Sequence, residues 1–193
     1  MTNTHKSCSE VEPAATPHRL LAAAERARAL DGAAELVVKP LRRLFGGRAG
    51  RTLRGRAFGH PLRPPAVTGP IGAWLHSALL DAPPRNEAAA RRLVDIGLRA
   101  TPPTVVLGAA DYSEMGDLSQ RRVGLVHAAT NAVAAGIFLT SNRLRLGGPA
   151  KAGTALSPVG LLALSCGRAL DGHLSHAQGA GAFRRPSART EAP

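Results

Sequence analysis

Three histidines are the residues of this sequence best suited to chemistry: His60, His127 and His173. Neutral imidazoles on separate helices can ligate a haem iron or carry protons. An imidazole between helices can equally be a structural group that only makes hydrogen bonds. Asn131 follows His127 by four residues, which places both side chains on one face of a helix. The histidines therefore indicate either a cofactor or proton site, or polar contacts between helices.

The elements that must position these histidines are four stretches nearly free of charge: residues 64–80, 93–110, 123–142 and 152–167. A transmembrane helix needs about 20 mostly apolar residues, and residues 123–142 reach that length. A helix of a soluble bundle carries a polar stripe, and residues 123–142 have none. We therefore predict an all-α fold, in which residues 58–181 form a four-helix transmembrane bundle.

Residues 93–110 are the weakest of the four predicted spans. Asp95 and Arg99 are four residues apart and can pair on one helical face. Pro102 and Pro103 follow, and we expect them to break or kink the helix. No internal repeat is visible in the sequence.

Up-and-down connectivity of four spans brings distant residues to one level. His60 precedes the first span, His127 lies near the start of the third, and His173 follows the fourth. Asp111 ends the second span at the same face. At about 1.5 Å per helical residue, His127 lies roughly 7 Å inside the boundary. An ionisable residue at that depth predicts a functional site with a nearby partner.

Residues 1–57 form a basic arm, and the chain as a whole has a net charge of +12. We expect a helix after Thr16-Pro17 that is broken at Asp31-Gly32. A second, amphipathic helix should be shortened or kinked by Pro40 and should end at Gly46-Gly47. A basic linker follows, with arginines at positions 48, 51, 54 and 56. Either the arm lies on an anionic membrane surface, or it is a solvated face with a flexible linker.

The distribution of basic residues predicts the orientation in the membrane. With four spans, the arm, the loop 111–122 and the C-terminal tail share one side and carry 18 Lys and Arg, whereas the other two loops carry 6. The positive-inside rule then places both termini in the cytoplasm, with the bundle in the cell inner membrane. Residues 182–193 are expected to be a disordered tail, and the N-terminus lacks the apolar core of a signal peptide.

Several short motifs resemble, in order and spacing, a bacterial four-helix membrane family known as domain of unknown function 2231. The resemblance runs from about residue 58 to residue 181. Its motifs are Gly59-His60-Pro61-Leu62-x-Pro64, Pro70-Ile71-Gly72-x-Trp74, Asp81, Gly108-x-x-Asp111-Tyr112, Arg122-x-Gly124-x-x-His127-x-x-x-Asn131, Ser157-x-x-Gly160 and Gly172-His173-Leu174.

This resemblance implies a membrane module that is often associated with electron-transfer partners. The positions that it singles out are His60, His127, His173, Asp111 and Asn131, together with the motif residues Trp74 and Asp81. Arg63 departs from the family, which commonly has a second histidine there. The arm is similar to that of members joined to a Rieske-type domain. Such a cluster needs two Cys and two His, and the tail after His176 has neither, so an iron–sulfur partner is expected on a separate chain.

Three functions follow as expectations. The first is a redox-associated membrane module or scaffold, whose cytoplasmic histidines form a proton site or bind haem b. The second is a non-catalytic membrane anchor for a partner protein. The third is a soluble basic protein that binds nucleic acid, although no nucleic-acid-binding motif accompanies the charge. We expect no catalytic activity, because the sequence contains no nucleophile elbow, phosphate loop or HExxH motif.

Overall fold

The computed structural model describes residues 22–56, 59–82 and 86–176, with side chains described as far as residue 168. Within these ranges every regular element is a helix and no strand is present. The all-α prediction is therefore confirmed. The predicted disordered tail and the helix expected after Thr16-Pro17 fall wholly or partly outside the described residues.

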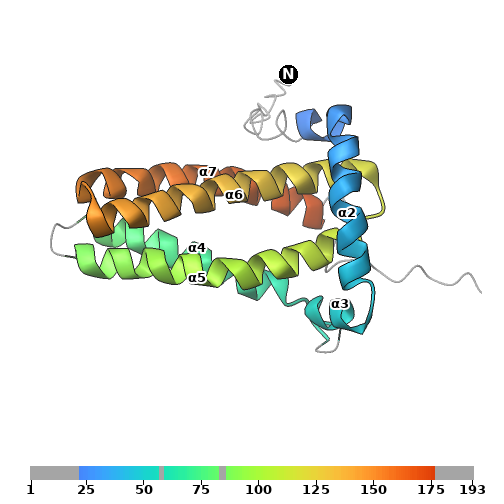
Figure 1. Ribbon diagram of the computed structural model, residues 1–193, viewed down its shortest axis with the longest axis horizontal. Coiled ribbons are helices and arrows are strands. Elements are labelled where there is room, and N and C mark those ends of the chain that lie inside the picture. The colour runs from blue at the N-terminus through green and yellow to red at the C-terminus, as the bar shows by residue number, and fades with distance from the viewer. Residues whose placement is uncertain (1–21, 57–58, 83–85, 177–193) are drawn as a thin grey trace, which may run out of the picture.

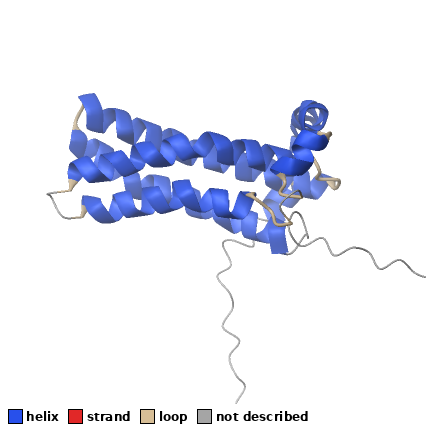
Figure 2. Cartoon of the chain, turned by 90° about the horizontal axis from the view of Figure 1, so that it is seen from below, coloured by secondary structure: helices blue, strands red, loops and turns tan. Residues whose placement is uncertain are grey.

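Four long helices lie side by side as two antiparallel hairpins (Figure 1). The first hairpin joins α4 (Arg63–Asp81) to α5 (Glu87–Tyr112), and the second joins α6 (Leu118–Gly147) to α7 (Ala150–His176). Each helix contains one of the four predicted stretches and extends beyond it. Figure 2 shows the same helices from below, with loops as the other described structure.

The proline pair in α5 does not break the helix, so of the two expected outcomes, a break or a kink, the break does not occur. Pro102 and Pro103 lie within a continuous 26-residue helix. The fixed φ of proline suits a helix, and its cost is the loss of two backbone donors. Neighbouring contacts hold α5 in place: the Thr104 hydroxyl lies 2.9 Å from the Ala100 carbonyl and 3.3 Å from the Ala66 carbonyl of α4.

The core between the hairpins is built on one aromatic pair. The rings of Trp74 and Phe138 stack with centroids 4.2 Å apart and an interplanar angle of 9°. Val94, Ala134 and Leu164 surround them and are buried. Each ring also lies against a glycine of its own hairpin. Trp74 lies against Gly97, and Phe138 lies against Gly160.

Residues of α4 face residues of α6 at one constant separation in the sequence. At each end of α4, one side chain contacts a residue of α6 that lies 64 positions later in the sequence. The two rings of the aromatic pair are also 64 positions apart. The three pairs are Arg63–His127, Trp74–Phe138 and Asp81–Arg145. Positions 63, 74 and 81 are separated by whole numbers of helical turns, so they share one face of α4.

Contacts inside the two hairpins are also equivalent. Ser77 of α4 donates to the Ala90 carbonyl of α5 at 2.9 Å, and Ser141 of α6 donates to the Gly153 carbonyl of α7 at 2.6 Å. The bundle is thus a repeated helical hairpin, its two copies related by an approximate twofold axis along the bundle. The repeat is not visible in the sequence because few of the equivalent residues are identical.

The basic arm crosses one end of the bundle. Helix α2 (Asp31–Phe45) lies roughly perpendicular to the four long helices, and α3 (Arg48–Leu53) follows it (Figure 1). The break expected at Asp31-Gly32 lies earlier, at Ala27 and the 3₁₀ turn η1 (Arg28–Leu30). Asp31 instead begins α2, where a carboxylate is favoured by the helix dipole. As predicted, α2 ends before Gly46-Gly47, and it runs through Pro40 for 15 residues.

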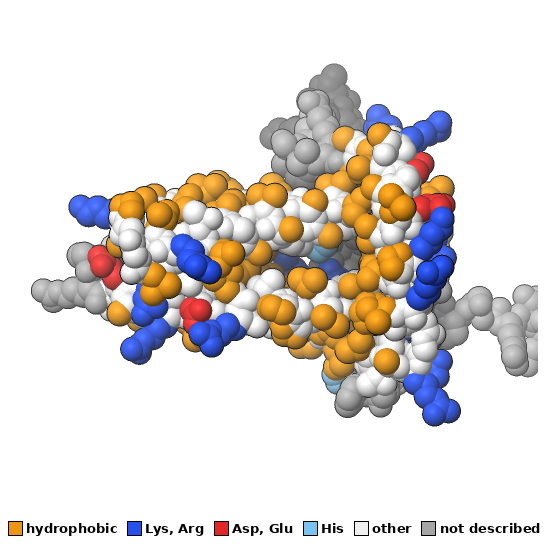
Figure 3. Space-filling model, viewed as in Figure 1, with side chains coloured by type: hydrophobic (Ala, Val, Ile, Leu, Met, Phe, Trp, Pro, Cys, Tyr) orange, Lys and Arg blue, Asp and Glu red, His pale blue; other side chains and the backbone are white. Residues whose placement is uncertain are grey.

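On the face of the bundle shown in Figure 3, apolar side chains are spread along the long helices among polar and backbone atoms. Exposed large hydrophobic side chains occur on all four long helices. By length and composition, α6 is the one helix in the described ranges that qualifies as a membrane span. Only 22% of its most apolar window is buried inside the molecule, unlike the core helix of a soluble protein. The four-helix bundle is thus present, and membrane spanning is supported for α6 alone.

We expect Gly97→Ala to destabilise the bundle. A methyl group at this position would lie 2.4 Å from Nε1 of Trp74, and overpacking of this kind costs about 1–3 kcal/mol. Gly72→Ala in α4 is the matched control, since no atom lies within 4 Å of its added carbon and alanine is the better helix former. Thermal unfolding of the purified protein should show a lower midpoint for Gly97→Ala than for Gly72→Ala. Equal midpoints would contradict the close packing of Trp74.

Candidate functional site

A polar cluster lies between the hairpins at the end near α2. His127 of α6 places its Nδ1 atom 2.8 Å from the Gly167 carbonyl of α7. A carbonyl only accepts hydrogen bonds, so Nδ1 carries the proton and Nε2 is the acceptor. Nε2 lies 2.9 Å from the Asn131 amide nitrogen and 3.3 Å from Nη2 of Arg63. Both nitrogens of the imidazole therefore have partners within the protein.

Asp111 completes this cluster at the end of α5. Its carboxylate lies 4.0 Å from Nε of Arg63, and both side chains are partly exposed. Gly167 allows α7 to approach closely, because a methyl group there would lie 2.7 Å from Oδ1 of Asn131. We call Arg63, Asp111, His127, Asn131 and Gly167 the His127 cluster. Figure 3 shows histidine and basic side chains within a hollow between the hairpins close to α2.

The other two histidines are not part of the cluster as described. His60 is exposed, and its Nδ1 atom lies 3.5 Å from the Pro61 carbonyl. His173 is on α7, but its side chain lies outside the described residues. Arg63, which departs from the family resemblance at a histidine position, takes the place next to His127. The arginine at position 63, where the family commonly has a histidine, was the feature of the sequence that could have indicated the contact with His127.

The described side chains do not fit a haem held by two histidines. Such a haem needs an open Nε2 and a second imidazole facing it. Nε2 of His127 instead meets two N–H groups, of which one belongs to a guanidinium cation. Within the described residues, no three His, Cys, Asp or Glu side chains are grouped to hold a metal ion. The cluster can orient helices and hold hydrogen bonds, but it offers no ligand to iron in this arrangement.

A second polar cluster lies at the opposite end of the bundle. Asp81 of α4 accepts two hydrogen bonds from Arg145 of α6, at 2.7 and 2.6 Å. Their side chains are 7% and 4% exposed. Arg145 also donates to the hydroxyls of Ser157 at 2.8 Å and Ser141 at 3.2 Å. We call these four residues the Asp81 cluster.

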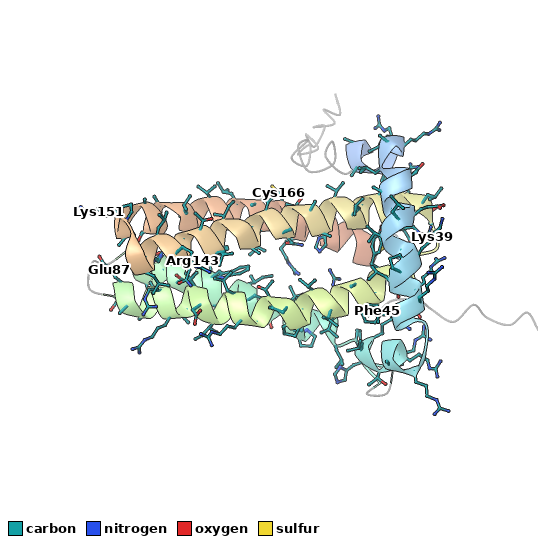
Figure 4. All side chains as sticks on the ribbon, viewed as in Figure 1. Lys39, Phe45, Glu87, Arg143, Lys151 and Cys166 are labelled. Carbon is teal, nitrogen blue, oxygen red and sulfur yellow. The ribbon has the colours of Figure 1, made fainter. Side chains whose placement is uncertain are left out.

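Two motif residues from the sequence analysis are therefore structural. Asp81 forms a buried ion pair, and Trp74 forms the aromatic stack of the core. Arg145 was missed, because the third apolar stretch was taken to end at residue 142 and the arginine to lie in a loop. In the structure α6 continues to Gly147, which brings Arg145 inside the bundle. Figure 4 shows that Arg143, two residues earlier, lies near this same end.

Arginines bind the arm to the bundle. Arg122 of α6 donates to the Asp31 carboxylate at 2.5 and 2.8 Å and to the Glu25 carbonyl at 2.6 Å. Arg42 of α2 donates to the carbonyls that follow α5, those of Ser113 and Met115, at 3.0 Å each. The arm is thus held on the end of the bundle by an arginine of the bundle and by an arginine of the arm.

Part of the basic linker is helical, and its last two arginines contact residues at or after the end of α5. Two of its arginines lie in α3. Arg54 is 8% exposed, pairs with Glu114 at 2.9 Å and donates to the Ala110 carbonyl of α5 at 3.2 Å. Arg56 pairs with Glu114 as well, at 3.1 Å. Part of the basic charge therefore serves contacts within the protein, whereas Arg48 and Arg51 are exposed.

Comparison with protein-family models, curated proteins and solved structures found no match for this chain. The resemblance described above therefore stays a prediction. The candidate site rests on the geometry of the two polar clusters and on the docked arm.

We expect Arg145→Met to destabilise the bundle strongly. The substitution leaves the Asp81 carboxylate buried without its cation, which typically costs about 3–5 kcal/mol. The double variant Asp81→Leu/Arg145→Met should recover much of this loss, because no charge remains buried. Arg143→Met is the control, since Arg143 is exposed two residues away. Chemical unfolding of Arg145→Met, Asp81→Leu, the double variant and Arg143→Met measures the coupling, and additive losses in the double variant would argue against the ion pair.

The contact between Arg122 and Asp31 makes arm docking sensitive to acid. The hydrogen bond from Arg122 lowers the pKa of the Asp31 carboxyl below its ordinary value of 3.8. A lowered pKa stabilises the docked arm above the ordinary value, and this contribution is lost as the pH falls through the lowered pKa.

Hydrogen exchange from about pH 5 to about pH 3, corrected for intrinsic rates, should therefore show protection falling more in α2 than in α6. Asp31→Asn should reduce the protection of α2 at the higher pH and remove most of the pH dependence. Glu35→Gln alters the exposed pair with Lys39 on the same helix and should behave like the natural protein. If Asp31→Asn keeps the full pH dependence, another carboxylate is responsible.

Proposed function

We propose that this protein is a membrane scaffold: a bundle embedded in the inner membrane, with the arm held across its cytoplasmic end. The observation that carries the proposal is the apolar outer surface. Large hydrophobic side chains are exposed on each long helix, among them Leu79 on α4, Ile96 on α5, Val133 on α6 and Leu162 on α7. A soluble protein of this size rarely exposes so much connected apolar surface.

The position of α2 supports this placement. The helix lies across the end of the bundle, as an interfacial helix lies in the plane of a membrane (Figure 1). Three of its apolar residues are exposed. Val37 and Leu44 lie on one flank, seven residues apart, whereas Leu36 lies beside Arg43. Lys39 and Arg43 lie on another flank. Such a helix places charge in water beside the headgroups and apolar side chains at the acyl boundary.

The geometry of the His127 cluster favours a scaffold over a cofactor-binding module. The imidazole is satisfied by groups of this chain, and the arm closes that end of the bundle. The resemblance to the domain of unknown function 2231 supports a partner in electron transfer, such as an iron–sulfur or other redox protein on a separate chain. In this proposal the bundle anchors that partner, and the arm sets the level at which it sits.

The alternative of a soluble nucleic-acid-binding protein is weakened by the arm contacts. Arg42, Arg54 and Arg122 bind carbonyl and carboxylate groups of this chain. These arginines are therefore not available to phosphates without undocking the arm. The sparse aromatic residues, 3% of the chain, also disfavour base stacking.

Extraction of cell membranes with alkaline carbonate tests the proposal. We expect the protein to remain in the membrane pellet, because an integral protein is held by its apolar surface and not by charge. Release by salt alone would reject the membrane placement and revive the nucleic-acid alternative. A Soret band in the purified protein would contradict the scaffold role assigned to His127.

A charged substitution on the outer face of α6 sharpens this test. Val133→Arg introduces a cation at an exposed position in the middle of the apolar stretch, where insertion costs about 2.5–3.5 kcal/mol. We expect less membrane-integrated protein for Val133→Arg than for Leu146→Arg, since Leu146 is equally exposed but lies at the end of the helix. On a soluble surface both changes are nearly neutral. Equal behaviour of the two variants would count against a bundle in lipid.

A further inference from the structure

The outer face of α5 differs from the rest of the bundle surface. Five of its exposed positions lie along one line, Arg92, Ile96, Arg99, Pro103 and Val106, and we call them the α5 stripe. They alternate at spacings of four and three residues, which is the pattern of a seam between two packed helices. No helix of this chain covers the stripe within the described residues.

An ion pair lies on this stripe. Arg99 donates to the Asp95 carboxylate at 2.8 Å, and the two side chains are 79% and 37% exposed. Val94, next to Asp95, accepts the indole hydrogen bond of Trp74, which stacks on Phe138 of α6. The pair is therefore level with the apolar stretch of α6 and does not lie at the end of the bundle. In lipid, charged groups at this level need protein or water around them.

The prolines add polar backbone atoms to the same face. Because Pro102 and Pro103 have no N–H, the carbonyls of Leu98 and Arg99 lack their usual donors in the helix. Such groups are tolerated in a membrane helix where neighbouring protein or water satisfies them. One turn of α5 thus combines a carboxylate, a guanidinium and carbonyls without their helical donors.

The internal repeat shows that these polar groups are not required by the fold. In the second hairpin, Gly160 is equivalent to Gly97, so Pro158 and Leu162 of α7 take the places of Asp95 and Arg99. Leu162 is exposed and apolar, as expected for contact with lipid. The charged pair is specific to α5, which points to a contact that α7 does not make.

We propose that the α5 stripe binds a second copy of this chain, with Arg99 of each copy paired to Asp95 of the other. This inference rests on the membrane placement proposed above. Two copies inserted in the same direction are related by a twofold axis along the membrane normal, so their α5 helices run parallel. The Arg99 side chain leans toward the N-terminus of its helix and can reach Asp95 of the other copy, one turn away. A second copy fits because the pair is complementary in charge to itself.

Disulfide formation in membranes tests the contact. In a background with Cys8→Ser and Cys166→Ser, Ile96→Cys should form a cross-linked dimer on mild oxidation. Val159→Cys is the control, because it occupies the equivalent position on α7 with similar exposure, 47% against 54% for Ile96. We expect at least about a tenfold higher dimer yield for Ile96→Cys. Equal yields at the two positions would overturn the proposal.

Charge reversal tests the pairing itself. Asp95→Arg or Arg99→Asp alone brings like charges together and should reduce the yield by about tenfold. Co-expression of these two variants with different tags should restore a mixed dimer, since each supplies the charge that the other needs. Reversals without effect on the yield would reject the pairing.

The same samples separate this inference from the proposed function. Monomeric protein that resists carbonate extraction would overturn the dimer and leave the membrane scaffold in place. Protein found in the soluble fraction would overturn both, because the dimer is proposed for a bundle in lipid.

Discussion

The register between α4 and α6 is the constraint on which the structure depends. Both helices begin at the end near the arm, and three side-chain pairs at one constant separation hold them in parallel. A polar pair lies at each end, with the Trp74–Phe138 stack between them. A slip of one residue would rotate every pair by about 100° and leave the Asp81 carboxylate buried without Arg145. The cost of that unpaired charge selects a single packing.

This register also explains the shape of the site. His127 faces Arg63 because the two residues occupy equivalent positions in the two copies of the hairpin. Near a twofold axis, equivalent residues of the two hairpins contact each other. Where the two hairpins have different residues at an equivalent position, the contact joins two different side chains. Asp81 and Arg145 carry opposite charges, and Arg63 and His127 are a cation and its acceptor. Both polar pairs therefore stabilise the bundle and leave little free capacity for a ligand.

In the arm, too, charged side chains are used for contacts within the protein. Much of its basic character suggested a surface for anionic partners, yet several of its arginines bind carbonyl groups at the end of α5. Helix C-termini expose such carbonyls, and guanidinium groups satisfy them well. The remaining exposed basic residues, such as Lys39, stand on the outer side of α2 (Figure 4). Within α2, Arg42 thus binds the bundle, whereas Lys39 points away from it (Figure 4).

The sequence by itself determined the helical class, the approximate place of four helices and the end of α2 at Gly46-Gly47, because these depend on local composition and backbone preference. It also singled out His127, Asn131, Trp74 and Asp81, and the structure shows the contacts that these side chains make. Only the tertiary structure decided which distant partners His127, Trp74 and Asp81 meet, since Gly167, Phe138 and Arg145 lie on other helices. The hairpin repeat was hidden for a related reason: it is conserved in contacts such as Ser77–Ala90 and Ser141–Gly153, and hardly in residue identity.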